Sequence, residues 1–429
     1  MKKHTTALLP FVGLCLLSSA VNAASLVDVY TKAKASDPQL LSAAASFQSS
    51  AEDVVQAKAA LRPNISGELN AKLQDSAASE RANSQGYSIN LTQPIYSPAL
   101  GSALERVEIN DQIAKLRYQQ SEQNLIVRTV DAYIAAMTAK SNLTTAIARE
   151  KAIKRRLDQA RVEFDVGVIA ITDVHEAKAS YDNARVDRIV REGELENSYQ
   201  SLQRLSGEAI NNVDTLDSKY PIEHLEPLTS SYWVERASEG NLALIMAEQN
   251  IEASSKDTAI AKSDRRPNLE LQASHSGSED SERGWSRDSQ LSLVLNVPIY
   301  QGGALNSKVR QSLSAQEVAR QNYQDNLREV TQTTRRLVRD IETNILAIAA
   351  RKQSIVSSQA ALNAVNEGFK AGTRNIVDLL QAEDSLFSAR NNYATARLEQ
   401  VRLLLSLKFQ TGEIAEQDIQ DIAKWMQAQ

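Results

Sequence analysis

Few residues of this chain have the types and spacing that enzyme chemistry requires. The one cysteine is Cys15, and the histidines beyond residue 23 are His175, His224 and His275, which fit no metal-site spacing. The sequence contains neither a glycine-rich phosphate loop nor a nucleophile elbow. We therefore predict that the protein is not an enzyme and uses no cofactor or resident metal.

Charged residues beside two glycine turns are better candidates for function. Asp173 follows the turn at Gly167, and Arg374 and Asp378 follow the turn at Gly372. Glycine permits a backbone conformation that other residues resist. A guanidinium makes two directed hydrogen bonds to a carboxylate, so residues of these types can form ion pairs. The alternative interpretation is a pair of ordinary helix-hairpin turns with surface charges, because an exposed ion pair typically contributes only about 0–1 kcal/mol.

Both turns belong to a repeat that spans most of the chain. The matching residues are Arg62-Pro63-Asn64 with Arg266-Pro267-Asn268, Pro94-Ile95-Tyr96 with Pro298-Ile299-Tyr300, and Phe164, Gly167, Asp173, Ala177, Ala184-Arg185 and Gly207 with Phe369, Gly372, Asp378, Ala382, Ala389-Arg390 and Gly412. The offset is 204 residues for the first two sets and 205 for the third. Such near-constant spacing indicates two copies of one structural unit, which usually build one symmetric architecture.

The N-terminus predicts export. Lys2 and Lys3 precede a short apolar stretch at 7–17, and Val21-Asn22-Ala23 has the small residues of a cleavage site. This order is typical of a secretory signal peptide, here 1–23, and the stretch is too short for a membrane span. The formal net charge of −5 and the lack of a basic patch argue against nucleic-acid binding.

Four segments alternate between apolar and polar residues, as strands with one apolar and one wet face do. The predicted strands lie at about 62–74 and 86–97 in the first copy and at about 266–276 and 288–300 in the second. We expect the polar links 74–85 and 276–288 to be exposed hairpin loops. The pattern alone leaves two interpretations open, a soluble sandwich with a packed core or a membrane barrel with its apolar face to lipid. The export signal and the segment lengths favour the barrel.

Two helical runs are too long for an ordinary globular core. The first is expected from Ser97-Pro98 to about Val166, and the second from Gly302-Gly303 to about Lys370. At a rise of about 1.5 Å per residue, each could reach roughly 100 Å. A coiled-coil seam is predicted in the second run, which taken alone could equally be a solvated two-stranded coil. Its residues are Tyr323, Leu327, Val330, Thr334, Leu337, Ile341, Ile345, Ile348, Ile355, Leu362 and Phe369.

Four strands per chain cannot close a barrel, because the smallest membrane barrels need about eight. An open sheet edge in lipid leaves backbone groups without hydrogen-bond partners. If the strands enter a membrane, several chains must therefore combine. Two chains would give eight strands with a filled interior, whereas three would give twelve strands and a passage.

At this point the sequence resembles the TolC family of outer-membrane efflux proteins. The resemblance covers essentially all of the chain beyond residue 23. It rests on the segment from Leu26 to Pro38, the paired Pro-Ile-Tyr strand exits, and two longer motifs. These are Phe164-x-x-Gly167-x-x-x-Ile171-Thr172-Asp173-Val174 and Gly368-Phe369-x-x-Gly372-Thr373-Arg374-Asn375-Ile376-Val377-Asp378.

The resemblance implies a fold class of α-helices plus transmembrane β-strands. A homotrimer would form a 12-stranded β-barrel in the outer membrane, continued by a 12-helix α-barrel in the periplasm. The chain would divide into a first repeat at 24–207, an equatorial linker at 208–236, a second repeat at 237–412 and an equatorial C-terminal tail at 413–429.

The implied function is an exit duct for tripartite efflux pumps, type I secretion or both, in the outer membrane of a Gram-negative bacterium. Small toxic compounds or proteins would pass through it passively. A periplasmic adaptor would couple it to an inner-membrane efflux or ABC transporter, and untwisting of the helix tips would open it. The alternative hypothesis is a secreted coiled-coil adhesin or scaffold without a pore. The sequence names neither the cargo nor the adaptor.

The resemblance also assigns roles to residues. The gate latch would comprise Thr172, Asp173, Phe369 and Arg374; the constriction would comprise Asp378 and Gln381; the adaptor-contact tips would comprise Val166, Gly167, Val168, Ala371, Gly372 and Thr373. Two of these depart from the family pattern. Phe369 replaces a tyrosine and loses a hydroxyl, and Gln381 replaces an acidic residue. We therefore expect one carboxylate ring, at Asp378, and weaker block by multivalent cations.

Overall fold

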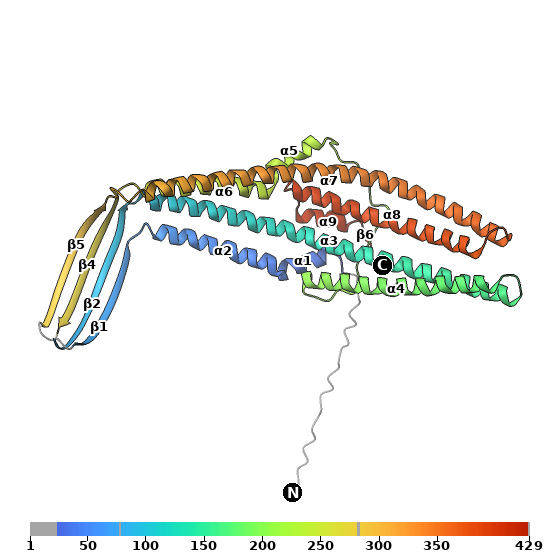
Figure 1. Cartoon of the computed structure of the whole chain (residues 1–429), viewed down its shortest axis with the longest axis horizontal. Coiled ribbons are helices and arrows are strands. Elements are labelled where there is room, and N and C mark those ends of the chain that lie inside the picture. The colour runs from blue at the N-terminus through green and yellow to red at the C-terminus, as the bar shows by residue number, and fades with distance from the viewer. Residues whose placement is uncertain (1–23, 77–78, 281–283, 428–429) are drawn as a thin grey trace, which may run out of the picture.

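The computed structural model describes residues 24–76, 79–280 and 284–427, so the predicted signal peptide 1–23 lies outside the described residues. The described chain is a long rod of helices with a sheet projecting from one end (Figure 1). The helices are α1 Leu26–Ser36, α2 Pro38–Ala59, α3 Pro98–Asp165, α4 Ile171–Ser206, α5 Ser230–Gly240, α6 Leu242–Ser263, α7 Ala304–Lys370, α8 Ile376–Gln410 and α9 Glu416–Ala423. The strands are β1 Asn64–Ser76, β2 Ser79–Tyr96, β3 Thr215–Leu216, β4 Asn268–Asp280, β5 Gly284–Asn296 and β6 Met426–Gln427.

The projecting sheet has the strand order β1-β2-β4-β5, and every neighbouring pair is antiparallel. Residues that lie opposite each other share a face, and one such row is Ile65, Leu91, Ala273 and Leu291. In the single chain this apolar face is open, since 74% of Leu291 is exposed. Among the described residues, β1 pairs only with β2 and β5 only with β4, so both edges of this sheet are unpaired.

The strand ends differ from those expected. The hairpin loops predicted at 74–85 and 276–288 are wrong for most of their length, because β1 continues to Ser76, β2 begins at Ser79, β4 continues to Asp280 and β5 begins at Gly284. Polar side chains leave backbone pairing intact, so polarity here marks a wet strand rather than a loop. In contrast, β5 ends at Asn296, short of the expected residue 300. Pro298 follows this end and has no N–H with which to continue a ladder.

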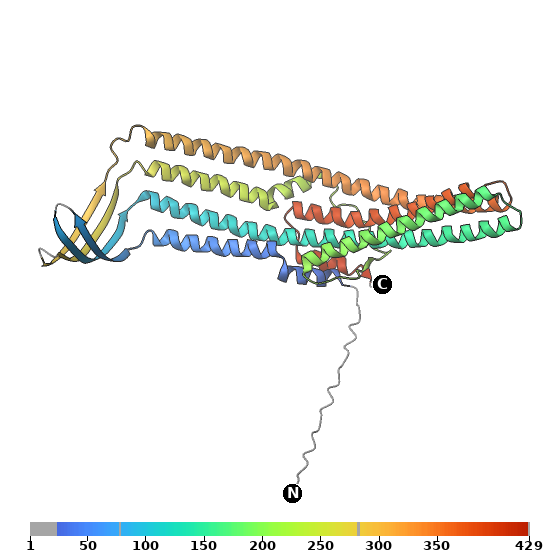
Figure 2. The same ribbon diagram turned by 60° about the horizontal axis from the view of Figure 1, so that its bottom comes forward.

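Shorter helices lie beside the two long helices α3 and α7. The order α2, α3, α6, α7 is visible in Figure 2, and each neighbouring pair is in contact. Two pairs of short helices follow one another along the chain, α1 with α2 and α5 with α6. The break within each pair falls at a matching position of the repeat. Asp37 accepts a hydrogen bond from the backbone N–H of Leu40 at 2.9 Å, and Asn241 accepts one from Ala243 at 3.0 Å. Each break is therefore an N-cap that starts a new helix.

Asp37 is the more strongly held of the two caps. Its carboxylate is 2% exposed and accepts hydrogen bonds from both terminal nitrogens of Arg128, at 3.2 and 2.7 Å. Burial opposes ionisation of this carboxyl, but the bonds from Arg128 and Leu40 outweigh it. The net result is a pKa held below the usual range for aspartate.

The largest apolar core lies at the waist, where α1 and α9 pack against α3, α4 and α8. Its most deeply buried large side chains are Leu26, Leu125, Tyr133, Leu202 and Ile419. The Tyr133 hydroxyl donates to the carbonyl of Ala24 at 2.8 Å and accepts from the N–H of Asp214 at 2.9 Å. Strand β6, near the end of the described chain, pairs with β3 here. The waist thus joins segments from both ends of the described chain.

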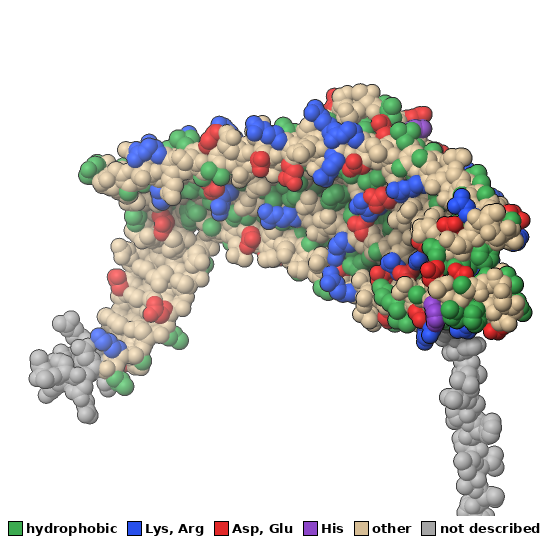
Figure 3. All heavy atoms as spheres, turned by 45° about the vertical axis from the view of Figure 1, so that its right-hand side comes forward, with side chains coloured by type: hydrophobic (Ala, Val, Ile, Leu, Met, Phe, Trp, Pro, Cys, Tyr) green, Lys and Arg blue, Asp and Glu red, His purple; other side chains and the backbone are tan. Residues whose placement is uncertain are grey.

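Away from the waist the helices pack along narrow seams. The predicted seam of α7 is confirmed in its middle, where Val330, Thr334, Leu337, Ile341, Ile345 and Ile348 are buried. The outer members, from Tyr323 to Phe369, are half-buried. None of the described helices carries a hydrophobic stretch long enough to cross a lipid bilayer. On the face seen in Figure 3, charged side chains are spread over the helices and fewer appear on the sheet.

Candidate functional site

The two helical hairpins end in the same kind of turn, at the end of the rod opposite the sheet (Figure 1). Gly167 has φ +77° and Gly372 has φ +71°, the left-handed conformation that glycine adopts most easily. The next residue closes each turn, with the Val168 N–H donating to Glu163 at 2.8 Å and the Thr373 N–H donating to Gly368 at 2.9 Å. This bonding satisfies carbonyls that the helix end would otherwise leave free.

The two tips differ in chemistry although they share a backbone. In the first tip Val166 and Val168 are 69% and 71% exposed. In the second, Ala371 and Thr373 occupy the matching positions and are also exposed. The predicted adaptor-contact residues are therefore accessible in the single chain, and the first tip is the more apolar.

The predicted latch residues lie on both sides of the two turns. Thr172 and Asp173 are in the first turn of α4, Phe369 is in the last turn of α7, and Arg374 precedes α8, one position before its capping residue. Among the described residues, Asp173 and Arg374 of one chain form no ion pair with each other. Instead, Arg374 Nη1 lies 3.6 Å from Asp378 Oδ2 along its own chain. The latch between helices thus stays a prediction. Within one chain the partner of Arg374 is Asp378, four positions along, rather than Asp173 of the other hairpin.

Phe369 has an apolar packing role in this structure. The ring is half-buried and packs against a small cluster that includes Ile376 and Leu379 of α8 and Ile153 of α3. The side chain therefore contributes to holding α7, α8 and α3 together near the tip.

The predicted constriction residues lie on one side of α8. Asp378 is partly exposed and Gln381 is exposed, whereas Leu379 and Leu380 between them are buried. Glu383 and Asp384, farther along α8, both contact arginines of α3. Glu383 is 8% exposed and contacts Arg156 of α3 at 2.9 Å. Neither acidic side chain therefore adds to the exposed face of Asp378.

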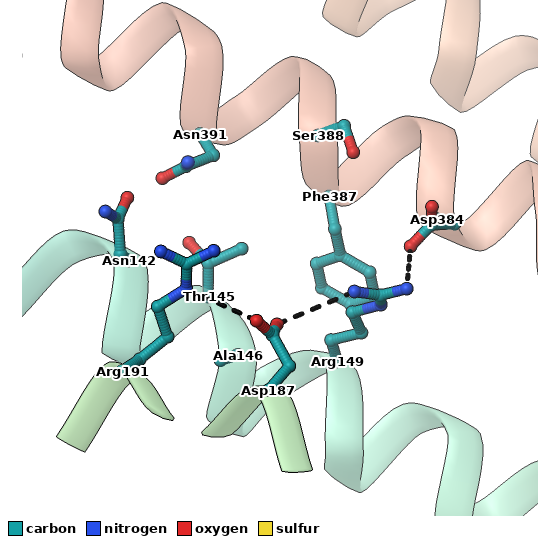
Figure 4. A pocket seen from close by; sticks show the side chains of 10 residues that line it. All are labelled: Asn142, Thr145, Ala146, Arg149, Asp187, Arg191, Asp384, Phe387, Ser388 and Asn391. Carbon is teal, nitrogen blue, oxygen red and sulfur yellow. Dashed lines mark hydrogen bonds and ion pairs between the residues drawn. The ribbon is translucent and has the colours of Figure 1, made fainter. Parts of the chain in front are cut away.

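A cluster that sequence reasoning missed joins the two hairpins (Figure 4). Arg149 of α3 lies between two carboxylates, with Nη1 3.6 Å from Asp187 of α4 and Nη2 2.5 Å from Asp384 of α8. Arg191 contacts the same Asp187 at 3.3 Å. We call Arg149, Asp187 and Asp384 the Arg149 clasp. The available signal was two arginines two turns apart on α3, Arg149 and Arg156, and two adjacent acidic residues on α8.

The clasp borders a hollow of about 160 Å³ between α3, α4 and α8. Asn142 and Asn391 line it from opposite helices, and each has a buried amide oxygen without a protein partner. The Nε of Arg149 is also buried and unpartnered. Within the part of the chain that the structure describes, no group of three His, Cys, Asp or Glu is arranged to hold a metal ion.

Comparison with known proteins supports a family assignment. The sequence profile of the outer membrane efflux protein family matches residues 29–208 and 233–413. The outer membrane protein TolC of Vibrio cholerae is 33% identical over 95% of this chain and 94% of its own length. The proteases secretion protein PrtF of Dickeya chrysanthemi is 24% identical over 98% of this chain and 95% of its own length.

A solved structure has the same fold. The chain superimposes on the crystal structure of CusC with a TM-score of 0.81 and 16% identity, covering 91% of this chain and 92% of that one. The profile matches both repeats, and the TolC relative aligns with nearly the whole chain. This chain therefore belongs to the TolC-like outer membrane efflux protein family, whose members are exit ducts of the outer membrane.

Proposed function

We propose that three copies of this chain form one closed conduit through the outer membrane and the periplasm. The observation that carries the proposal is a four-stranded sheet with two unpaired edges and one exposed apolar face. Unpaired strands need partners, and an exposed apolar face needs an apolar environment. Closure with identical copies in lipid meets both needs.

The two faces of the sheet differ as a barrel wall would require. Leu69, Leu291 and Leu295 lie on the apolar face and are 87%, 74% and 60% exposed. The opposite face carries polar residues, and one row contains Glu68, Ser88, Ser276 and Asp288. We assign the apolar face to lipid and the polar face to a water-filled lumen. Joining β5 of one copy to β1 of the next gives twelve strands with a passage, whereas two copies would give an interior filled by side chains.

The helices suit the same threefold closure. In the half of the rod nearer the sheet, α2 and α7 form the two ends of the layer α2-α3-α6-α7. One rotation therefore brings α7 beside α2 of the next copy while it joins the strand edges. Twelve helices then continue the barrel into the periplasm.

The tips provide the gate in this proposal. Thr172, Asp173, Phe369 and Arg374 hold neighbouring hairpins closed, and Asp378 with Gln381 lines the narrowest opening. The exposed tips 166–168 and 371–373 are the surfaces for a periplasmic adaptor, which couples the duct to an inner-membrane efflux or ABC transporter. Untwisting of the hairpins opens the passage for small toxic compounds or secreted proteins. The name of the PrtF relative supports secretion as one use.

The test combines assembly with conduction. The protein purified in detergent should run on a gel as a heat-labile trimer and should form cation-conducting channels in planar lipid bilayers. A stable water-soluble monomer, or a trimer without conductance, would refute the conduit. The first of those results is the one expected of a coiled-coil adhesin or scaffold, an alternative that gives the exposed apolar sheet no role.

A further inference from the structure

In the Arg149 clasp one side chain joins both hairpins of a chain. Figure 4 shows the guanidinium of Arg149 between Asp187 of its own hairpin and Asp384 of the other. Arg156, nearer the tip, also crosses between hairpins, to Glu383 at 2.9 Å and Asn366 at 3.3 Å. Of these two contacts, the clasp alone includes a residue of α4, Asp187.

The clasp is better protected from water than the Arg374–Asp378 contact at the second tip. The side chains of Arg149, Asp187 and Asp384 are 33%, 31% and 35% exposed. Those of Arg374 and Asp378 are 59% and 38% exposed and lie four positions apart in the same hairpin. Coulomb attraction grows as water is excluded, so an ion pair beside the hollow resists separation more than an exposed one does.

The position of the clasp gives it leverage over the tips. Arg149 lies 16 residues before Asp165, the last residue of α3, which corresponds to roughly 24 Å of helix. A relative tilt of about 10° between the hairpins at the clasp would move the tip by roughly 4 Å over that length. A restraint at this level therefore limits how far the tips can separate.

We propose that the Arg149 clasp is a second restraint on opening, formed within each chain and farther from the tips than the predicted latch. It holds the α3–α4 hairpin against the α7–α8 hairpin, and the conduit opens when the Arg149–Asp384 contact breaks. The proposal rests on the proposed conduit and adds a regulatory contact to its gate.

The first test removes one charge of the clasp. Asp384→Asn leaves Arg149 without its partner on α8, and we expect the open fraction in planar bilayers to rise by about tenfold, which corresponds to 1.4 kcal/mol in one equilibrium. The matched control is Glu150→Gln. Glu150 contacts Arg188 at 2.7 Å with similar burial, but both residues belong to the α3–α4 hairpin. This control should leave the open fraction unchanged.

The second test replaces the lost ion pair with a covalent bond. Asn142→Cys and Asn391→Cys, added to Asp384→Asn, place two thiols on opposite sides of the hollow in a chain that otherwise has no cysteine beyond residue 23. A short bifunctional thiol reagent should return the open fraction to that of the unmodified protein, and cleavage of the link should raise it again. Trimer heat-lability is measured for each variant, so that misfolding is not mistaken for opening.

The outcomes separate the two proposals. A conducting channel whose open fraction is unaffected by Asp384→Asn would overturn the clasp and leave the conduit intact. A rise that the crosslink does not reverse, or an equal rise in Glu150→Gln, would also overturn the clasp. An unmodified trimer that conducts nothing would overturn the conduit and the clasp together.

Discussion

Replacing Arg374 with glutamine tests how the proposed constriction at Asp378 is charged. In each chain Arg374 lies 3.6 Å from Asp378, and both side chains are substantially exposed. An exposed pair of this kind typically contributes only about 0–1 kcal/mol, so Arg374→Gln should barely change stability. Its main effect is on charge. In the proposed trimer, three Asp378 carboxylates would each be balanced by an arginine, and the variant would leave all three unbalanced.

The size of the effect follows from Coulomb's law. A unit charge about 8 Å from a divalent cation contributes about 1 kcal/mol in water, so removing three arginines favours binding by about 3 kcal/mol before screening. Screening at 0.1 M salt, where the Debye length is about 10 Å, reduces this to about 1–2 kcal/mol. We therefore expect Mg²⁺ to block Arg374→Gln channels about tenfold more tightly, and we expect single-channel conductance without Mg²⁺ to rise.

The assay is the Mg²⁺ concentration that halves single-channel current in planar bilayers. The matched control is Lys370→Gln, which also removes one positive charge near the second tip. Lys370 lies 2.7 Å from Glu367 in an exposed pair on α7, away from the face of Asp378. An unchanged blocking concentration in Arg374→Gln, or an equal change in both variants, would show that Arg374 does not neutralise the constriction.

Three further predictions concern Asp37 and Gly412. Asp37→Ala removes a helix cap and leaves Arg128 unpartnered, so the free energy of unfolding should fall by about 1–3 kcal/mol, measured by denaturation in detergent. Because the pKa of Asp37 is lowered on folding, its contribution to the free energy of unfolding is complete above the usual aspartate pKa of about 4 and is lost as pH falls through the lowered value. Asp37→Asn should abolish that part of the acid sensitivity. An unaltered acid profile would contradict this prediction. Gly412→Ala should prevent normal folding, because Gly412 has φ +74° and its added Cβ would lie 2.0 Å from the carbonyl oxygen of Gly240. Gly167→Ala is the control, since φ there is +77° but nothing lies within 4 Å, and only about 1–2 kcal/mol of backbone strain is expected; equal trimer yields would contradict the steric argument.

Local patterns in the sequence were sufficient for much of the fold. Alternation located all four long strands, because a period of two requires only neighbouring residues. The step pattern located the buried middle of the α7 seam, and the glycines at 167 and 372 located both turns. Strand ends were less predictable, since Ser79 and Asp280 are polar residues that pair in the ladder all the same.

The candidate site was less accessible to sequence reasoning, because its contacts depend on packing. The separation of Glu383 and Asp384 from the face of Asp378 follows from helical spacing and was predictable. The Arg149 clasp was not, since it requires α3 and α8 to lie together although the two residues are far apart in sequence. Arg374 shows the same difficulty. Asp378, four positions along the chain, competes with residues of the other hairpin as its ion-pair partner, and in the single chain Asp378 is the one in contact.

The unpaired edges of the sheet have a consequence for biogenesis. A newly exported chain carries two strands with free backbone donors and acceptors, and these would join any compatible strand they meet. Insertion before assembly would expose those groups to lipid, where they have no partner. We therefore expect the three subunits of the proposed trimer to associate first and the barrel to enter the bilayer last, so that expression at low copy number should slow maturation as well as reduce its yield.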